Sequence, residues 1–199
     1  MDKETISKTE LAWLAGIIDG EGCIYARMNK HNKSIRKLRT NEVYVIRMGI
    51  SITNTDVFLI KEVSRICENL KVGFAFSTQP PRDPRRGVIS IIVEGKGRSK
   101  KLLEAVLPYL INKKPQAEIL LKLIQYRESL GYTTTKGWTV AREGWRGKIT
   151  AVSPPDGWIP LCDDPIILGY IEELKTLKEQ TILPSETTRT ANRILQLPI

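Results

Sequence analysis

The chain has 199 residues, of which 41% are hydrophobic and 27% charged, as is usual for a soluble globular protein. Its 31 basic and 22 acidic residues leave a net charge of +9, which favours a polyanionic partner, most simply nucleic acid. One histidine and three widely separated cysteines argue against a structural zinc site and against His-dependent nucleophilic catalysis. The longest uncharged apolar run, residues 11–18, is too short to span a membrane. We expect no secretory signal and a reducing compartment with buried thiols, in a prokaryotic cytoplasm or an organelle.

The first predicted element is a helix over residues 8–19. Ser7 and Glu10 have the spacing of a capping box, in which two side chains satisfy two unpaired backbone donors. Apolar residues surround nearly the whole helix, so we expect it to be buried on all sides. Three small residues fall on one face: Ala12, Gly16 and Gly20. Because glycine costs about 1 kcal/mol relative to alanine inside a helix, close packing against another backbone is the natural reason for Gly16.

The helix ends in an acidic turn. Asp19 and Glu21 lie at its C-terminus, where the helix macrodipole disfavours negative charge. An acidic pair placed against this preference often serves a cation. A glycine-terminated helix that runs into a strand explains the same residues, so both interpretations stay open on this evidence.

The rest of the chain reads as strands and helices in a regular order. Alternating polar and apolar residues predict strands over residues 23–29, 44–53, 72–78 and 88–94. Caps and helical spacing predict helices over residues 56–70, 99–107, 115–130 and 165–180. This order is typical of an α+β fold with one four-stranded antiparallel sheet and helices on one face.

The sequence changes character after residue 130. Residues 133–164 contain three tryptophans and several glycines and prolines without clear periodicity, which suggests a functional loop, a small subdomain or a packed insertion. We therefore divide the chain into a core, residues 1–130, and a C-terminal extension, residues 131–199, which would end in a loosely attached helix over 185–197.

Residues 14–22, Leu-Ala-Gly-Ile-Ile-Asp-Gly-Glu-Gly, resemble the motif of the LAGLIDADG homing endonucleases. The two agree letter for letter except for Ile, Gly and Glu in place of Leu, Ala and Asp. The resemblance implies an αββαββα fold over about residues 5–130, whose sheet forms a DNA-binding saddle. It also implies that Glu21, with Gly20, binds a divalent metal, Mg²⁺ or Mn²⁺. Because the motif occurs once, as in the homodimeric members, we expect a homodimer with Ala12, Gly16 and Asp19 in its interface.

Two further site residues follow from the same resemblance. The segment Leu-Pro-Tyr-Leu-Ile-Asn-Lys-Lys-Pro at residues 107–115 resembles the family segment with a catalytic lysine, which spacing from the proline assigns to Lys113. An ordinary solvated lysine before a helix is the alternative. Asn54 occupies the place where the family often has a glutamine that positions solvent.

The basic and polar residues of the hairpins are the predicted DNA contacts. On the outward strand faces, hydrogen-bonding side chains could reach base edges, and we assign this role to Arg27, Asn29, Arg47, Ser51 and Thr53. The hairpin tips should mostly contact phosphates, through Lys33, Arg36, Arg82, Arg85 and Arg86. A solvated hairpin tip is an equally good explanation of the first loop.

Three functions compete at this point. The resemblance favours an intron-encoded, site-specific endonuclease that cuts a long, near-palindromic double-stranded DNA site by metal-dependent phosphodiester hydrolysis. A maturase of the same fold would bind structured intron RNA. A catalytically silent DNA-binding regulator would need neither Glu21 nor Lys113, so these two residues favour the endonuclease.

Overall fold

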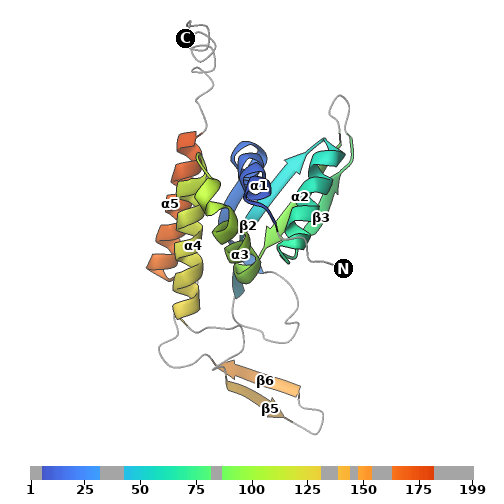
Figure 1. The fold of residues 1–199 in the computed structure, drawn as a ribbon. Coiled ribbons are helices and arrows are strands. Elements are labelled where there is room, and N and C mark those ends of the chain that lie inside the picture. Colours follow the sequence, from blue (N-terminus) through green and yellow to red (C-terminus); the bar gives the residue numbers. More distant parts are fainter. Residues whose placement is uncertain are drawn as a thin grey trace, which may run out of the picture.

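The structure is a computed structural model that describes residues 6–31, 43–81, 87–130, 139–143, 148–153 and 163–181. A four-stranded antiparallel sheet forms its centre, with the order β1-β2-β4-β3, and helices pack on it (Figure 1). The predicted α+β fold is therefore confirmed. Within the described part of the chain, no helix is both long and apolar enough to cross a membrane.

The core follows the predicted αββαββα order. Helix α1 (Lys8–Glu21) leads into the hairpin of β1 (Gly22–His31) and β2 (Val43–Asn54). Helix α2 (Val57–Asn69) precedes the second hairpin, β3 (Ala75–Gln79) and β4 (Val88–Glu94). Helix α3 (Lys96–Val106), a 3-10 turn (Leu107–Tyr109) and helix α4 (Lys114–Ser129) complete this part. Strands β5 (Thr139–Glu143) and β6 (Lys148–Ser153) form a separate two-stranded sheet, and helix α5 (Pro165–Thr181) follows.

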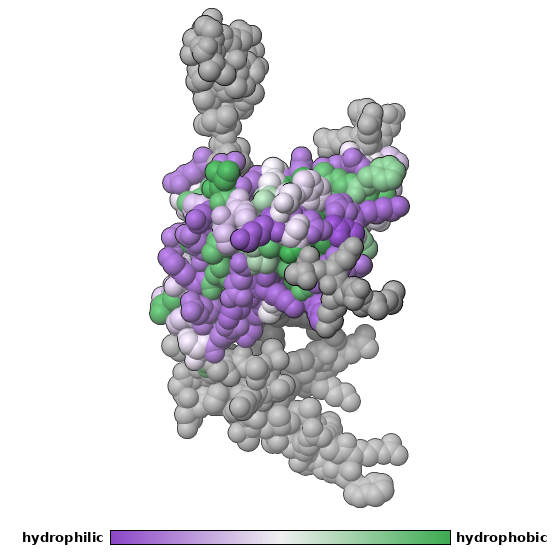
Figure 2. Space-filling view, viewed as in Figure 1, coloured by the Kyte–Doolittle hydropathy of each residue, from purple (hydrophilic) through white to green (hydrophobic). Residues whose placement is uncertain are grey.

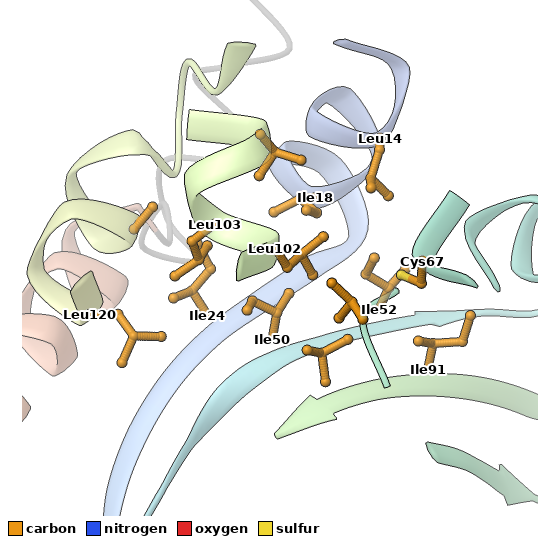
Figure 3. Packing of buried hydrophobic residues seen from close by; sticks show 14 of the residues in the cluster. Leu14, Ile18, Ile24, Ile50, Ile52, Cys67, Ile91, Leu102, Leu103 and Leu120 are labelled. Atoms are coloured by element: carbon orange, nitrogen blue, oxygen red, sulfur yellow. The ribbon is translucent and has the colours of Figure 1, made fainter. Parts of the chain in front are cut away.

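The hydrophobic core lies between the sheet and the helices. The strand alternation that predicted the sheet turns isoleucines inward, and Ile24 of β1 lies opposite Ile50 of β2. Both are at most 1% exposed, and they pack with Ile18 of α1 and Leu102 of α3 (Figure 3). One sheet face is therefore buried by helices, which leaves the other face for polar residues.

Local caps explain most of the helix starts. The capping box is present: the Ser7 hydroxyl accepts from the backbone N–H of Glu10, whose carboxylate accepts from the backbone N–H of Ser7. The Asp56 carboxylate accepts from the first backbone N–H groups of α2 at 2.8 and 3.3 Å. Asp164 caps α5 in the same way. These starts agree with the sequence predictions.

Two predicted boundaries are wrong. Helix α3 begins at Lys96 and not at Ser99, which is fully buried inside the helix. Gly95, with φ at 103°, turns the chain from β4 into α3, and its N–H donates to the carbonyl of Met48 at 3.0 Å. The strand predicted from Val72 begins at Ala75, because Val72 ends the turn after α2 as a core residue, 2% exposed.

The expectation that α1 is buried on all sides is wrong for the single chain. Leu14, Ala15 and Ile18 are buried, but Ala12, Trp13, Gly16 and Gly20 are exposed. A Cβ atom added at Gly16 or Gly20 would meet nothing within 4 Å, so neither glycine is explained by packing within the chain. Only one side of α1 faces the sheet and α3.

The surface in view in Figure 2 is largely hydrophilic, with apolar residues interspersed.

The C-terminal extension contributes α5 to the core. Helix α5 packs on α4 (Figure 1), and its Ile167 is fully buried in the same cluster as the sheet residues. The Tyr126 hydroxyl of α4 donates to Asp164 at 3.1 Å, which ties the start of α5 to α4. The division at residue 130 stays a prediction. The expected Gly131 cap and the helix over 185–197 lie outside the described residues. Of the predicted buried thiols, Cys67 is buried and Cys23 is exposed.

Candidate active site and nucleic-acid interface

The end of α1 gathers negative charge without a local counter-charge. Asp19 and Glu21 lie in the last turn, and α1 has no basic residue there. The Asp19 carboxylate instead accepts two backbone N–H groups from the segment before α4, that of Ile111 at 2.7 Å and that of Lys113 at 2.8 Å. Asp19 thus fastens this segment to the end of α1.

Lys113 supplies the positive charge that α1 lacks. Its Nζ donates to the backbone carbonyl of Asp19, one of the carbonyls that a helix leaves unpaired at its C-terminus. Partial burial lowers the pKa of Lys113, and the charges of Asp19, Cys23 and Glu21 oppose this shift. The structure therefore brings the predicted catalytic lysine to the end of α1, which also carries the predicted metal-binding residue Glu21.

Glu21 and Gly20 carry oxygen donors of the kind that a divalent metal binds. Both are exposed at the C-terminal end of α1, where the carboxylate and the helix macrodipole favour a cation. Among the described residues, no three His, Cys, Asp or Glu side chains are grouped so that they could hold a metal. Hard oxygen donors suit Mg²⁺, which keeps several waters and binds phosphate oxygens, so one carboxylate per chain is compatible with a shared site.

Asn54 lies at the same end of the sheet. The pairing of Gly22 with Ile52 brings the last residue of β2 close to the start of β1. The Asn54 side-chain oxygen accepts from the backbone N–H of Asp56 at 2.8 Å, so it holds the turn into α2. Its predicted role with solvent stays a prediction.

The outward face of the sheet carries the described DNA-contact candidates. Arg27 lies directly opposite Arg47, and Thr53 shares a 2.7 Å hydrogen bond with Ser90. The Arg27 guanidinium lies over the ring of Tyr25, 5.4 Å from its centroid. Asn29 and Ser51 occupy the same face by strand alternation. This face is polar and basic, as the alternation predicts.

Comparisons with known proteins agree with this geometry. No family model matches the chain. The DNA endonuclease I-CvuI of Chlorella vulgaris is 28% identical over 118 residues, which make up 58% of this chain and 64% of that protein. The chain thus spans less than two thirds of its curated relative.

Two crystal structures are similar over nearly the whole chain. Homing endonuclease I-CvuI, in complex with the I-CreI target in the presence of Mg and with the DNA not cleaved, gives a TM-score of 0.51 at 20% identity. The match covers 96% of this chain and 98% of that one. The same enzyme with its own target and Ca gives 0.52 at 19% identity, over 96% and 97%. The chain has the LAGLIDADG homing endonuclease fold. The motif at residues 14–22 and the similarity in sequence to I-CvuI agree with this fold.

Several predicted contacts of this LAGLIDADG-fold chain lie outside the described residues. They are the hairpin-tip residues Lys33, Arg36, Arg82, Arg85 and Arg86. Their assignment to phosphates stays a prediction.

Sequence reasoning missed Glu94 on the outward face. Glu94 of β4 is an acid on this polar face, and its carboxylate accepts from the Tyr25 hydroxyl at 3.0 Å. The Arg47 Nη1 lies 3.9 Å from the other Glu94 oxygen. Burial, followed by the bond to Glu94, raises the pKa of Tyr25 to about 12, so its hydroxyl stays a donor. Alternation in β4 already indicates an outward Glu94, but the partners depend on strand order.

Sequence reasoning also missed how α5 meets the LAGLIDADG sheet. The Lys178 Nζ of α5 donates to the sulfur of Cys23 at 3.3 Å. Cys23 follows Glu21 by two residues. A groove of about 460 Å³ runs between α5 and β1. It is lined by residues that include Arg27, Met28, Leu174, Lys175 and Lys178. No local signal predicts this contact, since its partners are 155 residues apart.

Proposed function

We propose that this chain is a site-specific, divalent-metal-dependent DNA endonuclease that acts as a homodimer. The arrangement at the end of α1 carries the proposal, because Glu21 lies exposed at the helix end to which Asp19 holds Lys113. The relative I-CvuI is a DNA endonuclease, and its structures contain DNA targets with Mg or Ca. These findings support a metal-dependent nuclease in this chain.

The residues of the site have distinct roles in phosphodiester hydrolysis. The Glu21 carboxylate and the Gly20 carbonyl would hold Mg²⁺ or Mn²⁺, which when bound polarises a phosphoryl oxygen and activates water. Lys113 offers a positive charge to the phosphate, where negative charge develops in the transition state. Because Asp19 accepts hydrogen bonds from both the backbone N–H and the ammonium group of Lys113, this side chain is positioned before DNA binds.

The exposed face of α1 supports a homodimer. Gly16 and Gly20 lie open along this face, with Ala12 one turn earlier, and the exposed Trp13 beside it retains 38% of its accessible surface. A second copy packed there would explain the two glycines and would bring two Glu21 carboxylates into one assembly. Asp19 would then lie near the interface while its carboxylate faces its own chain.

The outward sheet face would read the DNA. Arginine recognises guanine in the major groove, and asparagine, serine and threonine reach other base edges. We assign direct readout to Arg27, Asn29, Arg47, Ser51 and Thr53, and phosphate contacts to the basic hairpin tips.

Selection of cleaved duplexes from a randomised DNA library with Mg²⁺ tests this proposal. Wild-type protein should select one long, near-palindromic site, while Glu21→Gln should bind that site without cutting it. Glu104→Gln, an exposed change of the same charge on α3, is the matched control and should cut normally. Binding without cutting by wild type would indicate a regulator. If wild type selects no DNA, the endonuclease is refuted, and binding to structured intron RNA would identify the maturase.

A further inference from the structure

Three residues form one row across the outward face of the sheet. Tyr25 of β1 is paired with Gly49 of β2, and Gly49 is paired with Glu94 of β4. The Tyr25 hydroxyl donates to Glu94 at 3.0 Å although β2 lies between their strands. The two side chains together cross two strand spacings, about 10 Å. Gly49, which lies between them on β2, has no side chain.

Gly49 is required at this position for a second reason. A Cβ atom there would lie 2.2 Å from the backbone oxygen of Val93, so any other residue would displace β4. The middle of the row therefore stays open, and the Tyr25 ring can reach across it. The Tyr25–Glu94 bond is thus built into the register of three strands.

Glu94 also balances two facing arginines. Arg27 and Arg47 lie directly opposite each other, and like charges in this position are destabilising. The Glu94 carboxylate lies 3.9 Å from Arg47, while Arg27 rests on the Tyr25 ring. Among the described outward-facing residues of the four-stranded sheet, Glu94 is the one acid, so it supplies the one negative charge beside the two arginines.

An acid on a face that meets DNA weakens general affinity, because DNA is a polyanion. A carboxylate that pairs with an arginine can still raise selectivity. A DNA group must take the place of the carboxylate on the arginine, and a group that bonds the arginine poorly then binds less well. A phosphate satisfies a freely moving arginine anywhere along the duplex. The O6 and N7 atoms of guanine satisfy it in one geometry, at one base pair.

We propose that Glu94 is a specificity-determining residue that positions Arg47 for guanine and holds it away from phosphates. Tyr25 fixes the carboxylate from the opposite side through the gap at Gly49. The inference rests on the proposed DNA-binding function and on the readout role of Arg47. An acidic residue would therefore contribute to base selectivity on a face that is otherwise basic.

Equilibrium competition on the selected duplex and its single-base variants, in Ca²⁺ to limit cutting, tests the proposal. With Glu94→Gln, binding to unrelated DNA should tighten, and discrimination at the base pair read by Arg47 should fall about fivefold or more. Glu104→Gln makes the same charge change on α3 and should leave the base profile unchanged. Tyr25→Phe keeps the ring and should give a smaller loss at the same base pair.

The double variant Arg47→Ala/Glu94→Gln separates the possible outcomes. If Glu94 acts through Arg47, this variant should have the base profile of Arg47→Ala alone. An unchanged profile in Glu94→Gln, with a changed one in Arg47→Ala, overturns the inference and leaves the proposed function intact. If Arg47→Ala also leaves the profile unchanged, or wild type selects no DNA, both the readout assignment and the inference are wrong.

Discussion

The exposed glycine of α1 gives a prediction whose sign depends on the assembly. Gly16 lies inside α1, and a Cβ atom there would meet nothing within 4 Å of the single chain. Gly169 lies inside α5 with the same open surroundings, and both glycines are exposed. The substitutions Gly16→Ala and Gly169→Ala therefore form a matched pair.

In a monomer the two substitutions should have the same effect. Alanine is favoured over glycine inside a helix by about 1 kcal/mol, so each should raise the free energy of unfolding by up to that amount. For a chain of this length, this corresponds to an increase in Tm of about 2–4 °C. Without a partner on α1, nothing offsets the gain at Gly16.

In a homodimer packed through α1, the two substitutions should act oppositely. An extra methyl in a tight contact costs about 1–3 kcal/mol, and a two-fold interface receives it twice. At 2 kcal/mol or more in total, Gly16→Ala should raise the dimer Kd by about thirtyfold. Gly169→Ala should leave the Kd unchanged and still raise Tm.

Sedimentation over a range of protein concentrations and thermal unfolding distinguish these cases. We expect wild type and Gly169→Ala to be dimers. Gly16→Ala should be monomeric at protein concentrations at which wild type is still dimeric. If Gly16→Ala matches Gly169→Ala in both Tm and sedimentation, the α1 face is not the interface. The closely packed homodimer would then be refuted.

Two further predictions concern single carboxylates. Asp19→Ala removes the acceptor for two backbone N–H groups, including that of Lys113; it should cost about 1 kcal/mol or more in urea unfolding and lower cleavage more than DNA binding. Normal cleavage by a stably folded Asp19→Ala protein would contradict its positioning role. Hydrogen bonds from Arg65, and then from Ser7, lower the pKa of Glu10 from 4.5 to about 2. Because the folded pKa lies below the unfolded one, the stabilisation is present above pH 4.5 and is lost as pH falls through about 2. The Tm difference between wild type and Glu10→Gln should therefore be largest near pH 6 and vanish near pH 2, and a constant difference would contradict this linkage.

Most of the fold could be predicted from the sequence, because its signals are local. The Ser7 cap, the alternation in β2 and the Asp56 cap each depend on residues within one turn or along one strand. The boundary of α3 was wrong because Ser99, a good capping residue, is buried, while Gly95 makes the turn. A capping residue alone does not show which of two adjacent turns begins the helix.

The candidate active-site residues were predicted only through their resemblance to the family motif. The sequence motif at residues 14–22 predicts Glu21, and the spacing from Pro115 predicts Lys113. Lys113 contacts Asp19, which is 94 residues away in the chain, and no spacing rule connects the two. Whether Glu21 and Lys113 act together in catalysis stays a proposal.

The order of the elements, their caps and the strand residues that face the core follow from local sequence patterns, because backbone geometry sets these within a few residues. The tertiary structure decided which side of α1 remains uncovered, that Lys113 meets the end of α1 and that α5 meets β1. It also decided that Tyr25 reaches Glu94 across an intervening strand. These contacts depend on strand order and on helix packing, which bring together residues far apart in the chain, so local patterns carry no record of them.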